Sequence, residues 1–390
     1  MAHRMRLPPP LLFPSTTSRP LRLAAQINYD PTNPANPPYV LHSVAHKGGY
    51  LFAASDDTVR AFSPTLQPLG QLPVAQRGIT SMVKGSGKDS NAVFVTAKDG
   101  TVSCWDTRDL TKEAFRLKGK TRAGYLTASQ SSDQSCLAVG TELHQYEAMI
   151  DIWCATRRPC IGCIHGKLTR GSGEWSLAYR DLRTMQIQHT YTEAHSDDIT
   201  VVAFHPSPSL PHVLLSGSVD GLVNTYDVRI VDEDDAVQST AQFGASLASA
   251  GWMALPGQEG SSDHKGIFGA TTIETVQYWD MEQQEQIVDF GDVRDVALQP
   301  FRTEYLIGAH YNEALGGVCL LGGSLEGDVA LINAKDPERW YLEQLLSAKT
   351  SPKAHGCKGH RDIVRTACVN AETATIVTGG EDGRLCLWSP

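Results

Sequence analysis

The stretch 377–388, Val-Thr-Gly-Gly-Glu-Asp-Gly-Arg-Leu-Cys-Leu-Trp, decides the fold that we expect for this chain. It predicts a short strand, a tight turn at Asp382-Gly383 and an alternating second strand that closes on Trp388. Variants recur at 93–106 (VFVTAKDGTVSCWD), at 214–227 (LLSGSVDGLVNTYD) and, more weakly, at 52–63 (FAASDDTVRAFS). A repeated strand–turn–strand unit of this kind is half of a four-stranded blade, so the sequence predicts an all-β propeller.

The length of the chain fits seven blades. Seven blades of roughly 40–45 residues need about 300 residues, and the chain has 390. We place the blades at about 39–63, 68–108, 125–184, 193–230, 245–282, 291–334 and 355–390. The last blade reaches only the end of its third strand at Trp388. We expect the segment 21–28 (Leu-Arg-Leu-Ala-Ala-Gln-Ile-Asn) to supply its outer strand and to close the ring, which removes an exposed edge.

The composition excludes several classes of function. The formal net charge is −9, whereas a nucleic-acid-binding surface is basic. The sequence contains no run of 18 apolar residues, so we expect no contact with a membrane. Its nine cysteines are scattered, and no secretory signal is visible. We therefore expect a protein of the cytoplasm or nucleus that needs no cofactor or metal and binds other proteins or peptides.

Two blades carry a longer signature. Its four positions are His360, Thr378, Asp382 and Trp388 in the last blade, and His195, Ser216, Asp220 and Tyr226 in the fourth. This pattern resembles the His–Ser/Thr–Asp–Trp signature of WD40 repeats. The resemblance implies a relay in which the turn aspartate accepts from the histidine, the histidine bonds the hydroxyl, and the hydroxyl meets the aromatic. Because a buried carboxylate needs such partners, we interpret these residues as scaffolding, not as a catalytic set, and predict no enzymatic activity.

Other blades depart from this signature. The second blade keeps Asp99 and Trp105 but has Val95 at the hydroxyl position. The fifth blade ends in Tyr278-Trp279-Asp280 but has Ile273 at the aspartate position. These blades therefore carry degenerate copies of the repeat.

The leader, residues 1–20, differs in character from the repeats. It contains three arginines, no acidic residue, and prolines at positions 8, 9, 10, 14 and 20. We expect a disordered tail. A mitochondrial presequence is the alternative, but the Pro8-Pro9-Pro10 run opposes the amphipathic helix that such a signal requires.

Residues 154–180 read as an insertion in the third blade. Removing them joins Ile150-Asp151-Ile152-Trp153 to Asp181-Leu182-Arg183-Thr184, which makes a complete strand end. Three interpretations remain open: a surface loop, an intron translated by mistake, or a small metal site. The last would use Cys154, Cys160, Cys163 and His165 as sulfur and nitrogen ligands. A lone CxxC motif without a second half is weak support for a metal, and we predict none.

Residues from about 190 to the end carry a closer resemblance. In order along the chain, the strings are EAHSDDIT at 193–200, DGLVN at 220–224, DEDDA at 232–236, DVRD at 292–295, YLIG at 305–308 and TGGED at 378–382. They resemble the WD repeat-containing protein 89 family. This resemblance implies a seven-bladed propeller and a non-catalytic interaction protein.

Two further motifs concern partners. The run Asp232, Glu233, Asp234 and Asp235 is either a solvated turn or an acidic patch for a basic partner. The stretch 93–108 resembles the box through which WD40 substrate receptors meet the DDB-type adaptor of cullin-4 ubiquitin ligases. Carried over, the matching positions are Asp99, Trp105, Asp106 and Arg108, with Arg108 as the exposed contact. We expect an assembly scaffold, with a ubiquitin-ligase substrate receptor as the alternative.

Overall fold

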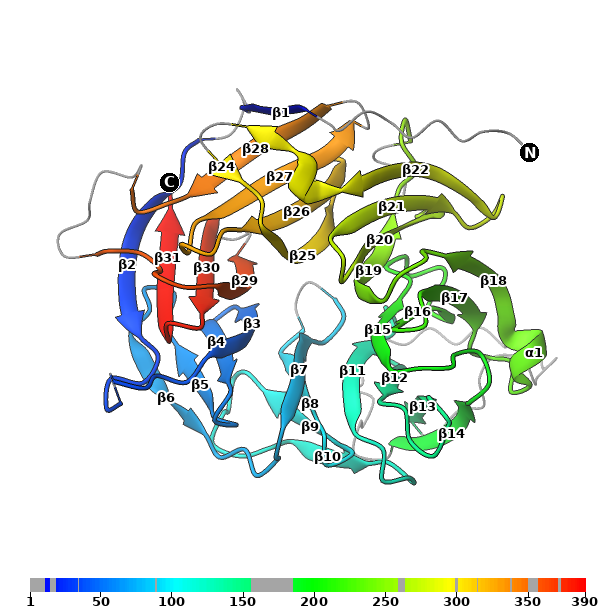
Figure 1. The fold of residues 1–390 in the computed structure, drawn as a ribbon. Helices are drawn as coiled ribbons and strands as arrows, with labels where there is room; N and C mark the ends of the chain where they lie inside the picture. The colour runs from blue at the N-terminus through cyan, green and yellow to red at the C-terminus, as the bar shows by residue number, and fades with distance from the viewer. Residues whose placement is uncertain are drawn as a thin grey trace, which may run out of the picture.

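The structure is a computed structural model of the 390-residue chain. It describes residues 11–14, 19–33, 35–87, 90–155, 185–258, 264–298, 301–313, 315–336, 339–349, 357–370 and 373–390. Seven sheets, antiparallel except for one added strand, are arranged around a central opening, as Figure 1 shows in a view down the ring axis. The predicted all-β, seven-bladed propeller is therefore confirmed.

The strands of each blade follow one another from the ring centre outward. Blade 1 contains β3 (Val40–His46), β4 (Gly49–Ala54), β5 (Val59–Phe62) and β6 (Pro68–Leu72). Blade 2 contains β7 (Ile79–Lys84), β8 (Ala92–Ala97), β9 (Thr101–Asp106) and β10 (Phe115–Lys118). Blade 3 contains β11 (Tyr125–Gln130), β12 (Cys136–Thr141), β13 (Ile150–Ala155) and β14 (Met185–Tyr191). Blade 4 contains β15 (Ile199–Phe204), β16 (Val213–Ser218), β17 (Leu222–Asp227) and β18 (Val237–Gln242).

The remaining blades include both ends of the chain. Blade 5 contains β19 (Leu247–Met253), β20 (Gly266–Thr271), β21 (Thr275–Asp280) and β22 (Glu285–Asp292). Blade 6 contains β25 (Tyr305–Asn312), β26 (Gly317–Gly323), β27 (Val329–Asp336), β28 (Arg339–Leu346) and an added strand, β1 (Leu11–Pro14). Blade 7 contains β29 (Val364–Asn370), β30 (Thr375–Gly380), β31 (Arg384–Ser389) and β2 (Arg22–Asn28). Short elements in the connections are α1 (Glu233–Ala236), the 3-10 turn η2 (Val293–Asp295), and β23 (Ala297–Leu298) paired with β24 (Phe301–Arg302).

The predicted blade ranges need a correction at their outer strands. The range 68–108 begins with β6, which belongs to blade 1, and the range 193–230 stops before β18. The recognisable sequence unit ends at the aromatic residue of the third strand. The outer strand, one face of which meets solvent, follows no equally strict pattern, and the sequence therefore placed the boundaries one strand too early.

The core lies between the blades. The second strands β4, β12, β20, β26 and β30 are buried along their whole length, as expected of strands covered on both faces. Neighbouring blades share apolar clusters: Leu51 and Val59 of blade 1, for example, pack with Val95 and Trp105 of blade 2. A single blade would leave these faces in water, so each blade depends on its neighbours for burial.

Side chains also join each blade to the next by hydrogen bonds. The Thr80 hydroxyl of blade 2 donates to the Tyr125 carbonyl of blade 3 at 2.5 Å, and the Thr200 hydroxyl of blade 4 donates to the Leu247 carbonyl of blade 5 at 2.7 Å. Five further bonds link the other junctions: Gly78 N to Asp57 (2.9 Å), Phe204 N to Ser129 (3.0 Å), Ser249 to Ala309 O (3.0 Å), Val364 N to Tyr305 (2.8 Å), and Ser43 with Thr366 (2.6 Å). The ring is therefore held by polar contacts around its inner wall as well as by apolar packing.

The ring is closed by the strand that the sequence predicted. β2 pairs antiparallel with β31, with Leu23 opposite Trp388 and Ile27 opposite Leu385 (Figure 1, blue beside red). Beyond the strand, the backbone N–H of Tyr29 donates to the Gly383 carbonyl at 2.8 Å. Gln26 reaches sideways as well, because its side-chain oxygen accepts from the N–H groups of Lys358 and Gly359 at 2.8 and 2.9 Å. Closure thus also orders the loop that leads to His360.

Part of the leader departs from the expected disordered tail. Leu11–Pro14 forms β1, which pairs parallel with β28 at the outer edge of blade 6. The prolines at positions 8, 9, 10 and 14 bracket this segment, and residues without an N–H group confine it to a short strand at a sheet edge. The first ten residues lie outside the described part of the chain.

The first two residues of the predicted insertion belong to a strand of blade 3. Cys154 and Ala155 belong to β13, where Cys154 lies opposite Cys136 and is buried in the core between blades 3 and 4. Residues 156–184, which include Cys160, Cys163, His165 and the segment 181–184, lie outside the described residues.

None of the described helices is long and apolar enough to cross a membrane.

We expect deletion of residues 1–28 to lower the melting temperature by about 10 °C, because it uncovers β31 and releases the loop before His360. Deletion of residues 1–18 is the matched control, since it keeps β2, and we expect its melting temperature to stay within about 3 °C of the full chain. Thermal unfolding followed by circular dichroism measures both. Equal melting of the full chain and the 1–28 deletion would show that β2 does not close the ring.

Candidate functional site

The eight predicted relay residues come together as two groups of four. In blade 4, His195 Nδ1 lies 3.0 Å from Asp220 and His195 Nε2 lies 2.7 Å from the Ser216 hydroxyl, which meets the Tyr226 hydroxyl at 3.0 Å. In blade 7, the equivalent distances from His360 are 3.1 Å to Asp382 and 2.8 Å to Thr378. The Trp388 indole N–H donates to Thr378 at 3.0 Å. Each aspartate side chain also accepts two backbone N–H groups, which fixes the turn around it.

The electrostatics of these groups agree with a structural role. Burial disfavours a charged imidazole, but Cys386 and the Asp382 carboxylate outweigh it and raise the pKa of His360 to about 10. Burial would raise the pKa of Asp382 and Asp220, yet the hydrogen bonds and charges of their histidines hold both values below the ordinary range. Carboxylates with lowered pKa stabilise the fold at neutral pH, and this contribution is lost as the pH falls through the folded-state value. The histidine and the aspartate of each relay therefore bond partners within the fold.

Blade 2 contains a different relay, which the sequence analysis did not predict. Gln76 takes the place of the histidine, and its amide donates to the Val95 carbonyl at 3.1 Å and to the Thr101 hydroxyl at 2.9 Å. The Ser103 hydroxyl donates to Gln76 at 2.5 Å and accepts from the Trp105 indole at 2.9 Å. The hydroxyl has moved from the second strand to the third, two residues before the tryptophan. The signal for this relay in the sequence was Ser103, two residues before Trp105, together with the polar Gln76 in the loop before β7.

Blades 1 and 3 use tyrosine instead. In blade 1, the Tyr29 hydroxyl donates to the Thr58 carbonyl at 2.9 Å, and the Arg60 guanidinium lies 4.8 Å from the centre of the Tyr29 ring. In blade 3, the Tyr125 hydroxyl donates to the buried Asp151 at 2.5 Å, and Thr190 donates to the other carboxylate oxygen at 2.7 Å. Burial and the neighbouring carboxylate raise the pKa of Tyr125, so it remains a donor. Both blades thus fix a buried tyrosine by hydrogen bonds, but the closing tryptophan of blade 3, Trp153, has a buried indole nitrogen without a hydrogen-bond partner among the described residues.

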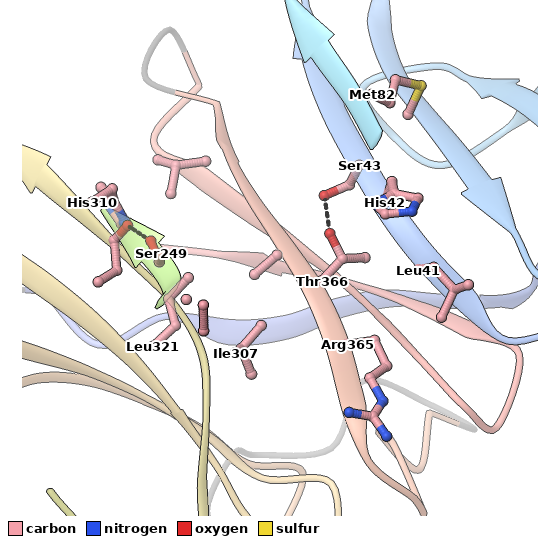
Figure 2. Close-up of a pocket in the computed structure, with 15 residues that line it drawn as sticks. Leu41, His42, Ser43, Met82, Ser249, Ile307, His310, Leu321, Arg365 and Thr366 are labelled. Atoms are coloured by element: carbon pink, nitrogen blue, oxygen red, sulfur yellow. Dashed lines mark hydrogen bonds between the residues drawn. The ribbon is translucent and has the colours of Figure 1, made fainter. Parts of the chain in front are cut away.

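The central channel forms a cavity of about 620 Å³ lined by the inner strands of blades 1, 2, 5, 6 and 7. In Figure 2, Ser43 and Thr366 point toward each other across the junction of blades 1 and 7, and Ser249 and His310 come from blades 5 and 6. Burial lowers the pKa of His42 to about 4 and also lowers that of His310, so both rings are neutral at pH 7. Arg365 is paired with Glu381 at 2.5 Å. The channel wall therefore mixes apolar and polar side chains and carries little charge.

One end of the ring collects most of the exposed apolar side chains. In an antiparallel blade, the turns between the second and third strands lie at one end, which we call the turn face. Among the described residues, nine large apolar side chains are exposed, and five of them lie in or beside these turns: Tyr39, Leu143, Tyr146, Ile273 and Leu325. The others, Leu69, Val231, Ile287 and Val369, lie elsewhere on the surface. Ile273 is also the residue that replaces the relay aspartate in blade 5.

Tyr146 has an unusual conformation on this face. It is 97% exposed at the tip of the hairpin between β12 and β13. The backbone groups of His144 and Glu147 bond each other at 2.8 and 3.0 Å, so Gln145 and Tyr146 form a two-residue turn with φ of 52° and 71°. Such turns favour asparagine and glycine, because a side chain in the left-handed region costs about 1–2 kcal/mol per residue. The sequence patterns that identify blades contain no signal for this residue.

The four residues of the predicted adaptor box lie along the third strand of blade 2 and in the turns before and after it. Asp99 is exposed and binds the Thr101 backbone and hydroxyl, whereas Trp105 is buried in the relay. Arg108 has a side chain that is 57% exposed, and its guanidinium forms a two-pronged pair with Asp106, the shortest contact being 2.5 Å. This hydrogen bonding lowers the pKa of Asp106. Arg229 and Asp227 repeat the arrangement in blade 4.

The four residues of the predicted acidic patch do not act alike. Asp232 caps α1 by accepting from the Asp234 N–H at 3.2 Å, and Asp234 and Asp235 are exposed. Glu233 instead turns toward the connection from blade 3. Its carboxylate accepts from the backbone N–H groups of Thr192 and Ala194 at 2.6 and 2.8 Å. Three carboxylates therefore face solvent, and the fourth holds the loop that precedes His195.

The prediction that no metal is bound concerns residues both inside and outside the described part of the chain. Across the described ranges, no three His, Cys, Asp or Glu side chains are grouped as metal ligands would be. Of the four residues in the metal interpretation, only Cys154 is described, and it packs in the core. The other three lie outside the described residues, so the metal interpretation stays as the sequence left it.

Comparisons with known proteins find similarity to WD-repeat proteins. The model of the WD domain, G-beta repeat, matches residues 185–227 and 351–389. An uncharacterized WD repeat-containing protein of Saccharomyces cerevisiae is 25% identical over 354 residues, 88% of this chain and 76% of that protein. WD repeat-containing protein GTS1 of Arabidopsis thaliana is 24% identical over 86% of this chain and 76% of its own length. A WD repeat-containing protein 89 homolog of Dictyostelium discoideum is 24% identical over 57% of each chain.

We expect Asp382→Ala to lower the free energy of unfolding by about 1–3 kcal/mol, because the His360 ring and two backbone N–H groups lose a buried partner. Asp99→Ala removes the exposed turn aspartate at the equivalent place in blade 2 and should cost about 0.5 kcal/mol or less. Urea unfolding of the two variants and the parent compares them directly. Equal costs would mean that Asp382 acts only as a turn residue.

Proposed function

Because the chain is a WD40-repeat β-propeller, and proteins of this family are generally protein-interaction scaffolds, we propose that it is a non-catalytic scaffold that docks a protein partner on its turn face. The single observation behind the choice of face is Tyr146, held 97% exposed in a left-handed backbone conformation. A large aromatic in a strained and solvated position adds nothing to folding stability. Exposed tyrosines of this kind serve as interface anchors.

The other exposed apolar residues of the turn face support the same surface. Ile273 and Leu325, which are 54% and 57% exposed, occupy the equivalent turns of the adjacent blades 5 and 6. The turn before Ile273 is braced by Arg294, which pairs with Asp292 at 2.6 Å and also reaches the Ile273 carbonyl. The Leu325 N–H donates to Glu304 at 2.7 Å. Rigid turns lose little conformational entropy on binding, which favours a preorganised protein interface.

We expect Tyr146→Gly to have opposite effects on binding and stability. Glycine adopts a positive φ without steric cost, so the free energy of unfolding should rise by about 0.5–1 kcal/mol. Loss of the ring should weaken partner recovery by roughly thirtyfold, the size expected for an interface anchor worth about 2 kcal/mol. Affinity purification of the tagged protein from its own cells with quantitative mass spectrometry, together with urea unfolding, measures both effects.

Leu69→Ala is the matched control for this experiment. Leu69 is 60% exposed on the outer strand β6, away from the turn face. Its partner recovery should equal that of the parent. If Tyr146→Gly and Leu69→Ala retain every partner of the parent protein, the turn face is not the docking surface.

A second candidate function is a substrate receptor of a cullin-4 ubiquitin ligase. The observation in its favour is Arg108, whose guanidinium is oriented by Asp106 at an exposed position that an adaptor could reach. Such a preoriented charge suits bidentate recognition. This role uses the end of the ring opposite to the turn face, so it is compatible with substrate docking through Tyr146.

For this candidate, we expect Arg108→Ala to reduce recovery of a cullin-4 adaptor by more than about thirtyfold, since truncating one partner of an interfacial charge pair costs 2–5 kcal/mol. Arg229→Ala is the matched control, because Arg229 makes the same pair with Asp227 in blade 4. Recovery of the adaptor with Arg229→Ala but not with Arg108→Ala supports the receptor. Absence of the adaptor from the parent purification eliminates it.

A further inference from the structure

The outer edge of blade 6 differs from the other blade edges. Among the strands that the structure describes, this sheet alone has five strands, and the fifth is β1 from the leader (Figure 1, at the rim of the ring). The pairing runs parallel, from Leu11 opposite Arg339 to Pro14 opposite Leu342. An edge strand exposes unpaired N–H and C=O groups that another strand can use. β28 thus has an edge that accepts an extended segment.

β1 is weakly held compared with the strand that closes the ring. It pairs through four residues, whereas β2 has seven. Parallel pairing is slightly less stable per residue than antiparallel pairing. Proline at position 14, and those at positions 8 to 10, prevent the strand from growing in either direction. β28 is eight residues long, so β1 covers only its first half.

The chain between β1 and β2 is anchored separately. The Gln344 side chain on β28 accepts from the Leu21 N–H at 2.9 Å and donates to the Arg19 carbonyl at 2.7 Å. This clamp lies outside the four residues that β1 covers. Release of β1 would therefore leave the clamp, β2 and the closed ring in place. The free-energy cost of releasing β1 from β28 is therefore far smaller than that of opening the ring.

We propose that the outer edge of blade 6 is a second binding site, for an extended apolar peptide segment that pairs with β28 in parallel as β1 does. In the isolated protein, residues 11–14 occupy this site and cover it. The partner is a short Leu- or Phe-containing strand, because the edge already accepts Leu-Leu-Phe-Pro. This site shares no residue with the turn face, and the inference does not rest on the proposed function.

The test uses the leader sequence itself as the probe. A fluorescein-labelled peptide of residues 9–16, Pro-Pro-Leu-Leu-Phe-Pro-Ser-Thr, is titrated by anisotropy against the full chain and against a chain without residues 1–18. We expect the truncated chain to bind at least roughly tenfold more tightly, because a tethered competitor acts at millimolar effective concentration. Hydrogen exchange should show that the peptide restores protection to β28 amides 339–342 in the truncated chain.

Two substitutions provide the matched controls. Alternate residues of a strand direct their N–H groups to the partner, so Leu12→Pro together with Phe13→Pro removes at least one donor in either phase. The doubly substituted peptide should not bind the truncated chain. The same double substitution in the full chain should open the edge and allow the unmodified peptide to bind, while the melting temperature stays close to that of the parent because β2 is intact.

Three results would overturn the proposal. They are equal peptide binding by the full and truncated chains, binding of the doubly substituted peptide, and a dimer of the full chain that truncation abolishes, since the edge would then serve a second copy. Tyr146→Gly in the truncated chain separates this site from the turn face. The variant should bind the peptide as the truncated parent does, whatever happens to its other partners.

Discussion

Pairing between β2 and β31 is the constraint on which the other features depend. A blade buries its faces only against its neighbours, so the clusters between blades are complete only when the ring is closed. β2 fills the outer position of blade 7, and its Gln26 also binds the loop before His360. The relay of blade 7 is therefore positioned by a residue from the start of the chain. Ring closure and local turn geometry are parts of one arrangement.

The blades satisfy one requirement with several sets of residues. Each of three blades bonds a buried polar group of an aromatic or histidine side chain within the fold, with His195 and Ser216, with Gln76 and Ser103, or with Tyr125 and Asp151. Where the relay does not need the turn aspartate, the turn is free to carry something else. Ile273 and Tyr146 occupy such turns. Loss of the repeat signature in a blade thus coincides with the appearance of exposed apolar residues.

The sequence was sufficient for the parts of the molecule that repeat. The Asp-Gly turns, the seven-blade count and the closing strand follow from periodicity and from the missing outer strand after Trp388. It was insufficient where contacts are non-local or where a pattern had shifted. The hydroxyl of blade 2 lies on another strand, and the outer strands carry no signature residue such as the closing tryptophan. β1 pairs with β28, more than 300 residues away, and the repeat pattern does not predict that contact. The exposure of Tyr146 depends on a left-handed turn conformation, which the alternating pattern of a strand does not predict.

Closure by strands from opposite ends of the chain also governs how the protein is made. β2 precedes β31 in the chain with six blades between them, so β2 is synthesised well before its partner strand exists. Contacts of such high contact order form slowly. During this interval the unpaired strand and the open edges between blades can associate with other chains. Closure of the ring therefore cannot precede the synthesis of β31.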